Sequence, residues 1–187
     1  MLVIALALAI VAGYLRDGSL RNLAKLQLRA EPLVFGALLV QLTIPVVTPG
    51  LHLPVALALS LWLASFALLL IAVFLNREQP GLLIAGLGVA SNMLVIALNA
   101  GMPVTRSALE SIAPTPSTVG PHLFASDPLR HLASSTTRLP FLSDAIAITW
   151  PPQARAVVSV GDLLLVVGVF WLVQQHMVSR GKHRVGR

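Results

Sequence analysis

Five long apolar segments dominate this chain of 187 residues, and they leave few folds open to it. Only 11% of the residues are charged and 56% are hydrophobic, whereas a soluble domain carries roughly a quarter charged residues. A water-soluble fold has no room to bury so many Leu, Ala and Val side chains, but helices that face lipid need not bury them. The sequence therefore predicts an all-α, polytopic membrane helix bundle that forms one integral membrane domain. Its five predicted spans cover residues 1–15, 33–47, 53–75, 82–100 and 156–173.

The five segments differ in how well they fit a bilayer. As a helix, Met1–Leu15 would span only about 22 Å, which is short of the ~30 Å hydrocarbon core, so it must thin the bilayer or continue past Arg16. No basic residues precede its apolar residues, so we expect a retained helix rather than a cleaved signal peptide. The segment 33–47 is expected to end at the turn Thr48-Pro49-Gly50, and the segment 53–75 is the longest and clearest span.

Two basic segments set the predicted orientation. Four positive charges lie between Arg16 and Arg29, and four more lie between Arg180 and Arg187. Because Lys and Arg gather on the cytoplasmic side of membrane proteins, both segments are expected in the cytoplasm. Five spans satisfy this expectation with the N-terminus outside and the C-terminus in the cytoplasm. The expected location is the bacterial inner membrane.

The first basic segment has a helical pattern of its own. Arg21, Lys25 and Arg29 recur at intervals of four, and mostly Leu side chains fill the other side. This pattern predicts an interfacial amphipathic helix over Ser19–Arg29, with the three basic side chains as membrane-surface anchors on anionic lipid. A recognition surface for a cytoplasmic partner is the alternative. The net charge of +6 does not indicate nucleic-acid binding, because the basic residues adjoin apolar spans and aromatic stacking platforms are lacking.

Residues 101–155 form a long segment outside the predicted spans. They contain eight prolines and many Ser and Thr residues, which exclude long regular elements. A loop of this length in a compact protein is functional, a lid, or disordered. Two short apolar stretches, Leu139–Leu142 and Ala145–Ile148, are expected to fold back on the outer membrane face. Besides the lipid bilayer, the expected partner is a membrane protein that contacts this loop.

One carboxylate falls inside a predicted span. Asp162 lies about two turns into the fifth segment from its external end, where an ionisable group is costly. Its carboxylate is expected to accept hydrogen bonds from a neighbouring helix or from Arg138 or Arg155. Direct chemistry or ion handling is the alternative.

The fourth segment carries small and polar residues on one side. Gly81, Gly88, Asn92 and Asn99 follow one another at intervals of seven or four, which places them on one helix face. Such a stripe is typical of a helix-packing surface. Close approach by the fifth segment would bring Asn92 or Asn99 near Asp162. We therefore predict a polar packing cluster, with an active site as the alternative, formed by Gly88, Asn92, Asn99 and Asp162.

Asp144 precedes Asp162 by 18 residues and lies in the external loop. Two carboxylates that share a water form the acid and base of an aspartic peptidase, so these two residues are the candidate catalytic pair. The chain has no cysteine, and no histidine falls in the middle of a predicted span, so neither a metal site nor a cofactor is predicted. The five histidines are His52, His122, His131, His176 and His183.

Three motifs spread over the chain point to a family. Gly18-Ser-Leu-Arg-Asn-Leu-Ala follows the first span, Asn99-Ala-Gly-Met-Pro-Val ends the fourth, and Ser159-Val-Gly-Asp-Leu-Leu lies in the fifth. In these motifs the chain resembles an uncharacterised family of small bacterial multi-pass membrane proteins. The resemblance covers nearly the whole chain and implies a multi-pass topology, but it implies no reaction.

The last two spans carry a second, more distant resemblance. The segments Phe141–Ile146 and Val158–Asp162 resemble the closing portion of lipoprotein signal peptidase, a membrane aspartyl peptidase. The resemblance implies that Asp162 matches one catalytic Asp of that family. The other catalytic Asp follows an Asn by three residues, and Val95 stands at that position here. The resemblance thus implies a peptidase scaffold that has lost half of its dyad, unless Asp144 replaces the missing residue.

These features predict an integral membrane protein without identifiable catalysis, serving as an accessory, assembly or structural subunit of a membrane complex. Two alternatives stay open. One is a membrane aspartyl peptidase-like hydrolase that uses Asp144 and Asp162. The other is a small proton-coupled transporter that exploits Asp162.

Overall fold

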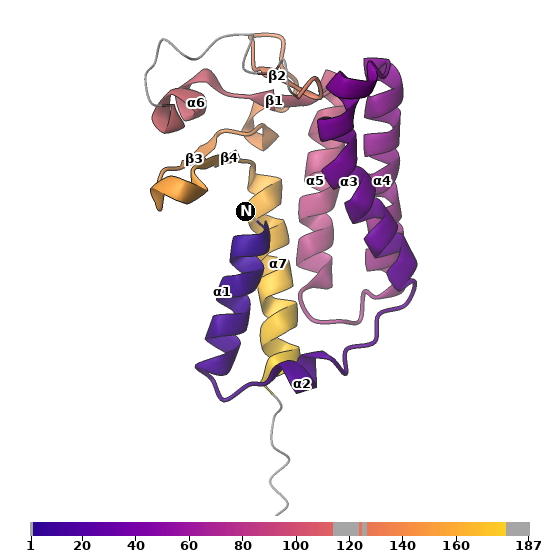
Figure 1. Ribbon diagram of the computed structural model, residues 1–187, viewed down its shortest axis with the longest axis vertical. Coiled ribbons are helices and arrows are strands. Elements are labelled where there is room, and N and C mark those ends of the chain that lie inside the picture. Colours follow the sequence, from indigo (N-terminus) through magenta and orange to yellow (C-terminus); the bar gives the residue numbers. More distant parts are fainter. Residues whose placement is uncertain (1, 114–123, 125–126, 179–187) are drawn as a thin grey trace, which may run out of the picture.

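The computed structural model describes residues 2–113, 124 and 127–178, and it is a helix bundle with a small cap at one end (Figure 1). Four helices are long and apolar enough to cross a membrane, and α1 (Leu2–Tyr14) is apolar but shorter. The prediction of an all-α polytopic bundle is confirmed, and these helices give the protein a membrane location. The four long helices are α3 (Glu31–Leu51), α4 (Val55–Leu75), α5 (Leu82–Asn99) and α7 (Val160–Met177).

The helices pack on one another in the order α1, α7, α5, α4 and α3. α1 and α7 run in the same direction and end together, because the backbone N–H of Ser19 donates to the carbonyl of Met177 at 3.0 Å. The segment Arg16–Arg29 therefore lies beside the end of α7, and we call this side of the bundle the basic end. The cap lies at the opposite end (Figure 1). The second basic segment, Arg180–Arg187, is outside the described residues.

α3 is longer than the sequence pattern indicated. Its predicted end at the turn Thr48-Pro49-Gly50 is wrong, because the helix continues through Pro45 and Pro49 to Leu51. Proline in a helix interior removes one backbone donor, and membrane helices tolerate this loss better than soluble ones. The turn comes instead at His52, which adopts a left-handed φ of 51° and donates its backbone N–H to the carbonyls of Thr48 and Pro49 in the last turn of the helix.

The interfacial helix at the basic end is much shorter than the predicted range Ser19–Arg29. α2 covers only Leu20–Leu23, and Ser19 caps it by accepting the backbone N–H of Asn22 at 3.3 Å. The rest of the segment, as far as Arg29, is not helical and runs across the basic end of the bundle. The Asn76 side chain holds it there, since its oxygen accepts the N–H of Arg29 at 2.7 Å and its nitrogen donates to the carbonyl of Arg29 at 2.8 Å. An extended chain covers more distance per residue than a helix, which explains why the helix stops early.

The three predicted membrane-surface anchors lie on this segment and have exposed side chains: Arg21, Lys25 and Arg29.

The cap consists of the described residues between α5 and α7. Its first strand pairs in parallel with its second, and its third pairs antiparallel with its fourth. An isolated bridge between Val104 and Asp144 joins the two small sheets. The cap elements are β1 (Met102–Val104), α6 (Arg106–Ile112), β2 (Arg130–Leu132), η3 (Pro140–Leu142), β3 (Ile146–Ile148), η4 (Pro152–Ala154) and β4 (Ala156–Val158).

The predicted start of the fifth span at residue 156 is wrong. Residues 156–158 form β4, which pairs with β3, and α7 begins at Val160 after Ser159 as its N-cap. Apolar residues lie on both sides of this boundary, with Ser159 and Asp162 between them, so hydrophobicity alone does not mark where the strand ends and the helix begins.

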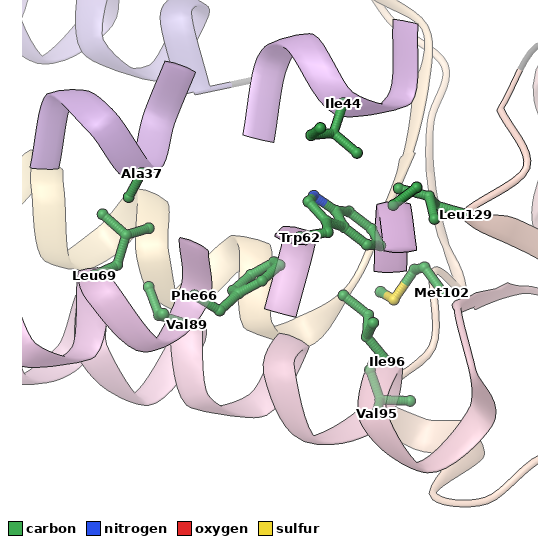
Figure 2. Packing of buried hydrophobic residues seen from close by; sticks show 11 residues of the cluster. Ala37, Ile44, Trp62, Phe66, Leu69, Val89, Val95, Ile96, Met102 and Leu129 are labelled. Carbon is green, nitrogen blue, oxygen red and sulfur yellow. The ribbon is translucent and has the colours of Figure 1, made fainter. Parts of the chain in front are cut away.

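One apolar core joins the bundle to the cap (Figure 2). Trp62 and Phe66 of α4 stack edge to face with ring centroids 5.6 Å apart, and residues of α3 and α5 surround them. Two cap residues, Met102 and Leu129, are buried in the same cluster, with Leu129 0% exposed. The cap is therefore packed into the end of the bundle, and the residues at its junction with α5 and α7 are held in place.

Candidate functional site

The site lies where α5 and α7 meet beneath the cap, and glycines allow the two helices to touch. A Cβ atom at Gly88 would overlap the carbonyl oxygen of Gly161, and one at Gly168 would overlap the backbone nitrogen of Ala85. Small residues that let two backbones approach are typical of helix contacts in membranes. The predicted stripe on α5 thus faces α7, and the close contact places Asn92 against the first turn of α7.

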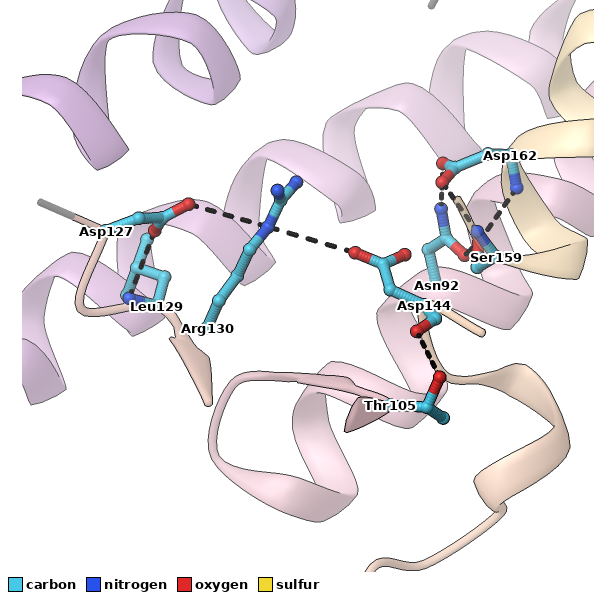
Figure 3. A network of polar contacts seen from close by, with 8 residues as sticks. All are labelled: Asn92, Thr105, Asp127, Leu129, Arg130, Asp144, Ser159 and Asp162. Atoms are coloured by element: carbon cyan, nitrogen blue, oxygen red, sulfur yellow. Dashed lines mark hydrogen bonds and ion pairs between the residues drawn. The ribbon is translucent and has the colours of Figure 1, made fainter. Parts of the chain in front are cut away.

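A hydrogen-bonded network of three side chains joins the helices at this point (Figure 3). The amide nitrogen of Asn92 donates to Oδ1 of Asp162 at 2.8 Å, and the hydroxyl of Ser159 donates to Oδ1 of Asn92 at 2.8 Å. The Ser159 and Asp162 side chains also form a reciprocal capping box, each accepting the other's backbone N–H at 3.0 Å. Both carboxylate oxygens of Asp162 therefore bind donors from within the fold.

The position of Asp162 differs from the one expected. It is the third residue of α7 rather than about two turns inside the helix, because α7 begins only at Val160. A carboxylate in the first turn of a helix is stabilised by the backbone N–H groups that point toward it. Of the donors expected for Asp162, the neighbouring helix supplies one, through Asn92.

Asn99 does not join this network. Its amide nitrogen donates to the carbonyl of Arg138 at 2.9 Å, and its oxygen accepts the backbone N–H of Arg138 at 2.8 Å. It therefore fastens the cap to the end of α5, as Asn76 fastens the basic segment at the other end. Asn99 shares a helix face with Asn92, but one residue binds the cap and the other binds α7.

Asp144 is buried in the cap with only 2% of its surface exposed. Its backbone is fixed on both sides, since its N–H donates to the carbonyl of Pro103 and its carbonyl accepts the N–H of Thr105, each at 2.9 Å. Its carboxylate faces Arg130, whose Nε lies 3.9 Å from Asp144 Oδ2 and 3.5 Å from Oδ2 of Asp127. Figure 3 shows Arg130 between the two carboxylates.

Burial controls the protonation of Asp144. Loss of solvation raises the pKa of Asp144 to about 7, the Arg130 guanidinium opposes this rise, and the negative charges of Asp162 and Asp127 add to it. The two predicted catalytic carboxylates therefore lie within electrostatic range of each other. Their contacts are separate, however, because Asp144 faces Arg130 and Asp162 binds Asn92 and Ser159.

Two residues of the site were missed by the sequence reasoning. Ser159 was recognisable, because Ser-x-x-Asp before an apolar segment is a capping-box pattern. Arg130 lies in the cap without a pattern that links it to Asp144. Across the described ranges 2–113, 124 and 127–178, no group of three or more His, Asp or Glu residues could hold a metal ion.

The comparisons with known proteins give a family but no activity. Residues 25–174 match the model of a family of unknown function, DUF5317, as the first of the two resemblances predicted. The matched residues include α3, α4, α5, the cap and most of α7. No curated protein and no solved structure matches the chain.

The contact of α5 with α7 gives a first test. We expect Gly88→Ala to lower the melting temperature of the detergent-solubilised protein by several degrees, because overpacking costs about 1–3 kcal/mol. Gly36→Ala on α3 is the matched control, since nothing lies within 4 Å of the added Cβ. Equal melting temperatures for the two variants would contradict the close contact.

Burial of Asp144 gives a second test. The unfolded carboxyl titrates near pH 4, whereas the folded one titrates at about 7. Between these values the folded protein holds a proton that the unfolded chain has lost, so the free energy of unfolding falls as pH rises through this window. We expect a lower melting temperature at pH 8 than at pH 5, and a smaller difference in Asp144→Asn. Exposed Glu78 provides the control, Glu78→Gln; a pH dependence that survives Asp144→Asn would rule out this origin.

Proposed function

This chain belongs to the DUF5317 family, whose function is unknown, and we propose that it is a non-catalytic accessory, assembly or structural subunit of a membrane complex. The cap is the proposed docking surface for a membrane-protein partner. The observation that carries the proposal is a pair of large aromatic side chains that the cap exposes. Trp150 is 79% exposed and Phe141 is 66% exposed.

Exposed aromatic residues have a different meaning in the cap than on the helices. Phe35 on α3 is 71% exposed, but α3 is a membrane span and lipid covers such a side chain. Trp150 and Phe141 lie in the cap, outside the spanning helices, and we infer that a partner protein covers them there. Trp in particular is enriched among the residues that dominate binding energy at protein interfaces.

The polar residues beneath the cap support a structural role. Both carboxylate oxygens of Asp162 accept hydrogen bonds, one from Asn92 and one from Ser159. Both side-chain amide atoms of Asn92 are likewise bonded, the nitrogen to Asp162 and the oxygen to Ser159. Asp144 is almost completely covered. These groups hold α5, α7 and the cap in one arrangement, which is what a surface presented to a partner requires.

The proposed orientation places the cap outside and the basic end in the cytoplasm of the bacterial inner membrane. Its support is the density of positive charge: Arg16, Arg21, Lys25 and Arg29 lie in one short segment at the end opposite the cap, whereas the four arginines of the cap are spread along a segment several times longer. α1, at about 20 Å, is shorter than the hydrocarbon core, and its amino end points to the same side as the cap.

The orientation is testable by labelling, because the chain has no cysteine of its own. Ser135→Cys places a thiol on an exposed cap residue, and Gln27→Cys places one on an exposed residue of the basic end. In intact spheroplasts we expect a membrane-impermeant maleimide to label Ser135→Cys only, and to label Gln27→Cys after lysis. The reverse pattern would overturn the orientation.

The subunit role is testable by purification in mild detergent from its native membrane. We expect a companion protein in stoichiometric amount, and we expect Trp150→Ala combined with Phe141→Ala to lose that companion at least tenfold with an unchanged melting temperature. Phe35→Ala, on the lipid-facing side of α3, should retain it. A native preparation that is a monomer without a stoichiometric companion would contradict the proposal.

Hydrolysis by Asp144 and Asp162 is a second candidate, and one observation favours it. A buried carboxyl with a pKa of about 7, within electrostatic range of a second carboxylate, has the protonation state of a general acid at neutral pH. The distant resemblance to lipoprotein signal peptidase supports Asp162 as one catalytic residue but supplies no second one. Val95 stands at the position of the missing Asp and is 0% exposed in the apolar core. A folded Asp144→Asn variant that loses a membrane peptidase activity would favour this candidate over the first.

The transporter alternative depends on Asp162 in ion handling, and the bonds to Asn92 and Ser159 argue for the structural role instead.

A further inference from the structure

An apolar cavity opens in the bundle on the side of the basic end. It has a volume of about 190 Å³, and four helices and the basic segment line it. α3 packs on α4 and α7 packs on α5, so α3 and α7 form opposite walls and α4 and α5 form the floor. We call it the basic-end groove. Its lining includes Val34 and Leu38 of α3, Leu69 of α4, Val89 of α5, and Leu165 and Val169 of α7.

The polar group in the lining is fully occupied. Asn76 lines the groove, but its oxygen accepts the backbone N–H of Arg29, and its nitrogen donates to the carbonyls of Arg29 and Ala72, both at 2.8 Å. An occupant therefore finds aliphatic side chains and no free hydrogen-bonding partner, which suits a hydrocarbon chain.

The position of the groove suits one leaflet of the bilayer, which is the inner one in the proposed orientation. Between Leu82 and Val89, and between Leu69 and Asn76, the lining extends over seven residues of helix, or about 10 Å along each axis. This depth is less than half of the ~30 Å hydrocarbon core. It fits the part of one acyl chain that lies nearest to the headgroup.

Two arginines adjoin residues that line the groove. Leu28 lines the groove and Arg29, which follows it, has an exposed side chain. Arg77 follows Asn76 and lies over the ring of Phe74 at 4.7 Å. The basic residues at this end outnumber the acidic ones: Arg16, Arg21, Lys25, Arg29 and Arg77 against Asp17, Glu31 and Glu78.

We propose that the basic-end groove binds one anionic glycerophospholipid, with an acyl chain between α3 and α7 and the headgroup phosphate beside Arg29. The aliphatic lining accounts for the chain, and the cationic mouth accounts for the choice of headgroup. The bound lipid fills the space that α3 and α7 leave between them. This site is separate from the cap and does not depend on the proposed subunit role.

The test is native mass spectrometry of the detergent-solubilised full-length protein titrated with phosphatidylglycerol or phosphatidylcholine of the same chain lengths. We expect one phosphatidylglycerol to be retained, with a preference of about tenfold over phosphatidylcholine, as a cation or two beside the headgroup would give. Arg29→Gln should lower that preference several-fold. Val34→Phe, which fills the groove, should reduce retention of both lipids at least tenfold.

Matched controls exist for each change. Arg138→Gln is the control for Arg29→Gln, because Asn99 binds the backbone of Arg138 as Asn76 binds that of Arg29, but Arg138 lies in the cap. Val46→Phe is the control for Val34→Phe, because Val46 is a lipid-facing residue of the same helix, α3. Both should bind lipid as the unaltered protein does. If Val34→Phe fails to fold, Val169→Phe fills the groove from the opposite wall.

Three results would overturn the proposal. One is equal retention of the two lipids. A second is retention that survives both groove-filling variants. The third is a dimer that Val34→Phe dissociates, which would make a second copy of the chain the occupant.

Discussion

The direct contact between the backbones of α5 and α7 is the constraint on which the rest of the structure depends. Gly88 and Gly161 bring the helices together, and the contact places Asn92 within reach of Ser159 and Asp162. α7 in turn carries α1 along its side, while β4 leads from the cap directly into its N-cap. A side chain larger than glycine at this contact would separate the helices that hold the cap and the first helix in place.

Side-chain amides fasten other segments to the helices of the bundle. An amide offers one donor group and one acceptor, so a single Asn or Gln can bind both the N–H and the C=O of a neighbouring segment. Gln174, for example, donates to the carbonyl of Ala9 at 2.6 Å and accepts from Arg16 at 3.0 Å, which joins α1 to α7. In surroundings with little water such bonds lack competition. Asn76 at the basic end and Asn99 at the cap each bind both backbone groups of one residue, whereas Asn92 and Gln174 join helices through one donated and one accepted bond.

Much of the architecture is predictable from the sequence, and the errors share a physical cause. The apolar segments locate the spans, and the spacing of Gly88 and Asn92 brings α5 to α7, because both signals are local and periodic. Apolar content alone does not locate the start of α7, since residues 156–158 become a strand only through pairing with β3; the capping-box pattern from Ser159 to Asp162 marks it instead. The partner of Asn99 and the short α2 depend likewise on groups far along the chain, the backbone of Arg138 and the side chain of Asn76. Asp162 shows the consequence for function. Two turns inside a span, its charge would need a functional explanation, but in the first turn of α7 it belongs to the capping box with Ser159.

The central claim is that Asp162 serves to hold α7 against α5. A double-mutant cycle measures this directly, with the free energy of unfolding in detergent determined for Asn92→Ala, Asp162→Ala, the pair, and the unaltered protein. We expect a destabilisation by each single change and a favourable coupling of about 0.5–1.5 kcal/mol between the two side chains, as double-mutant cycles give for hydrogen-bonded neighbours in membrane proteins. Additive effects, or an Asp162→Ala variant that unfolds as the unaltered protein does, would contradict the claim.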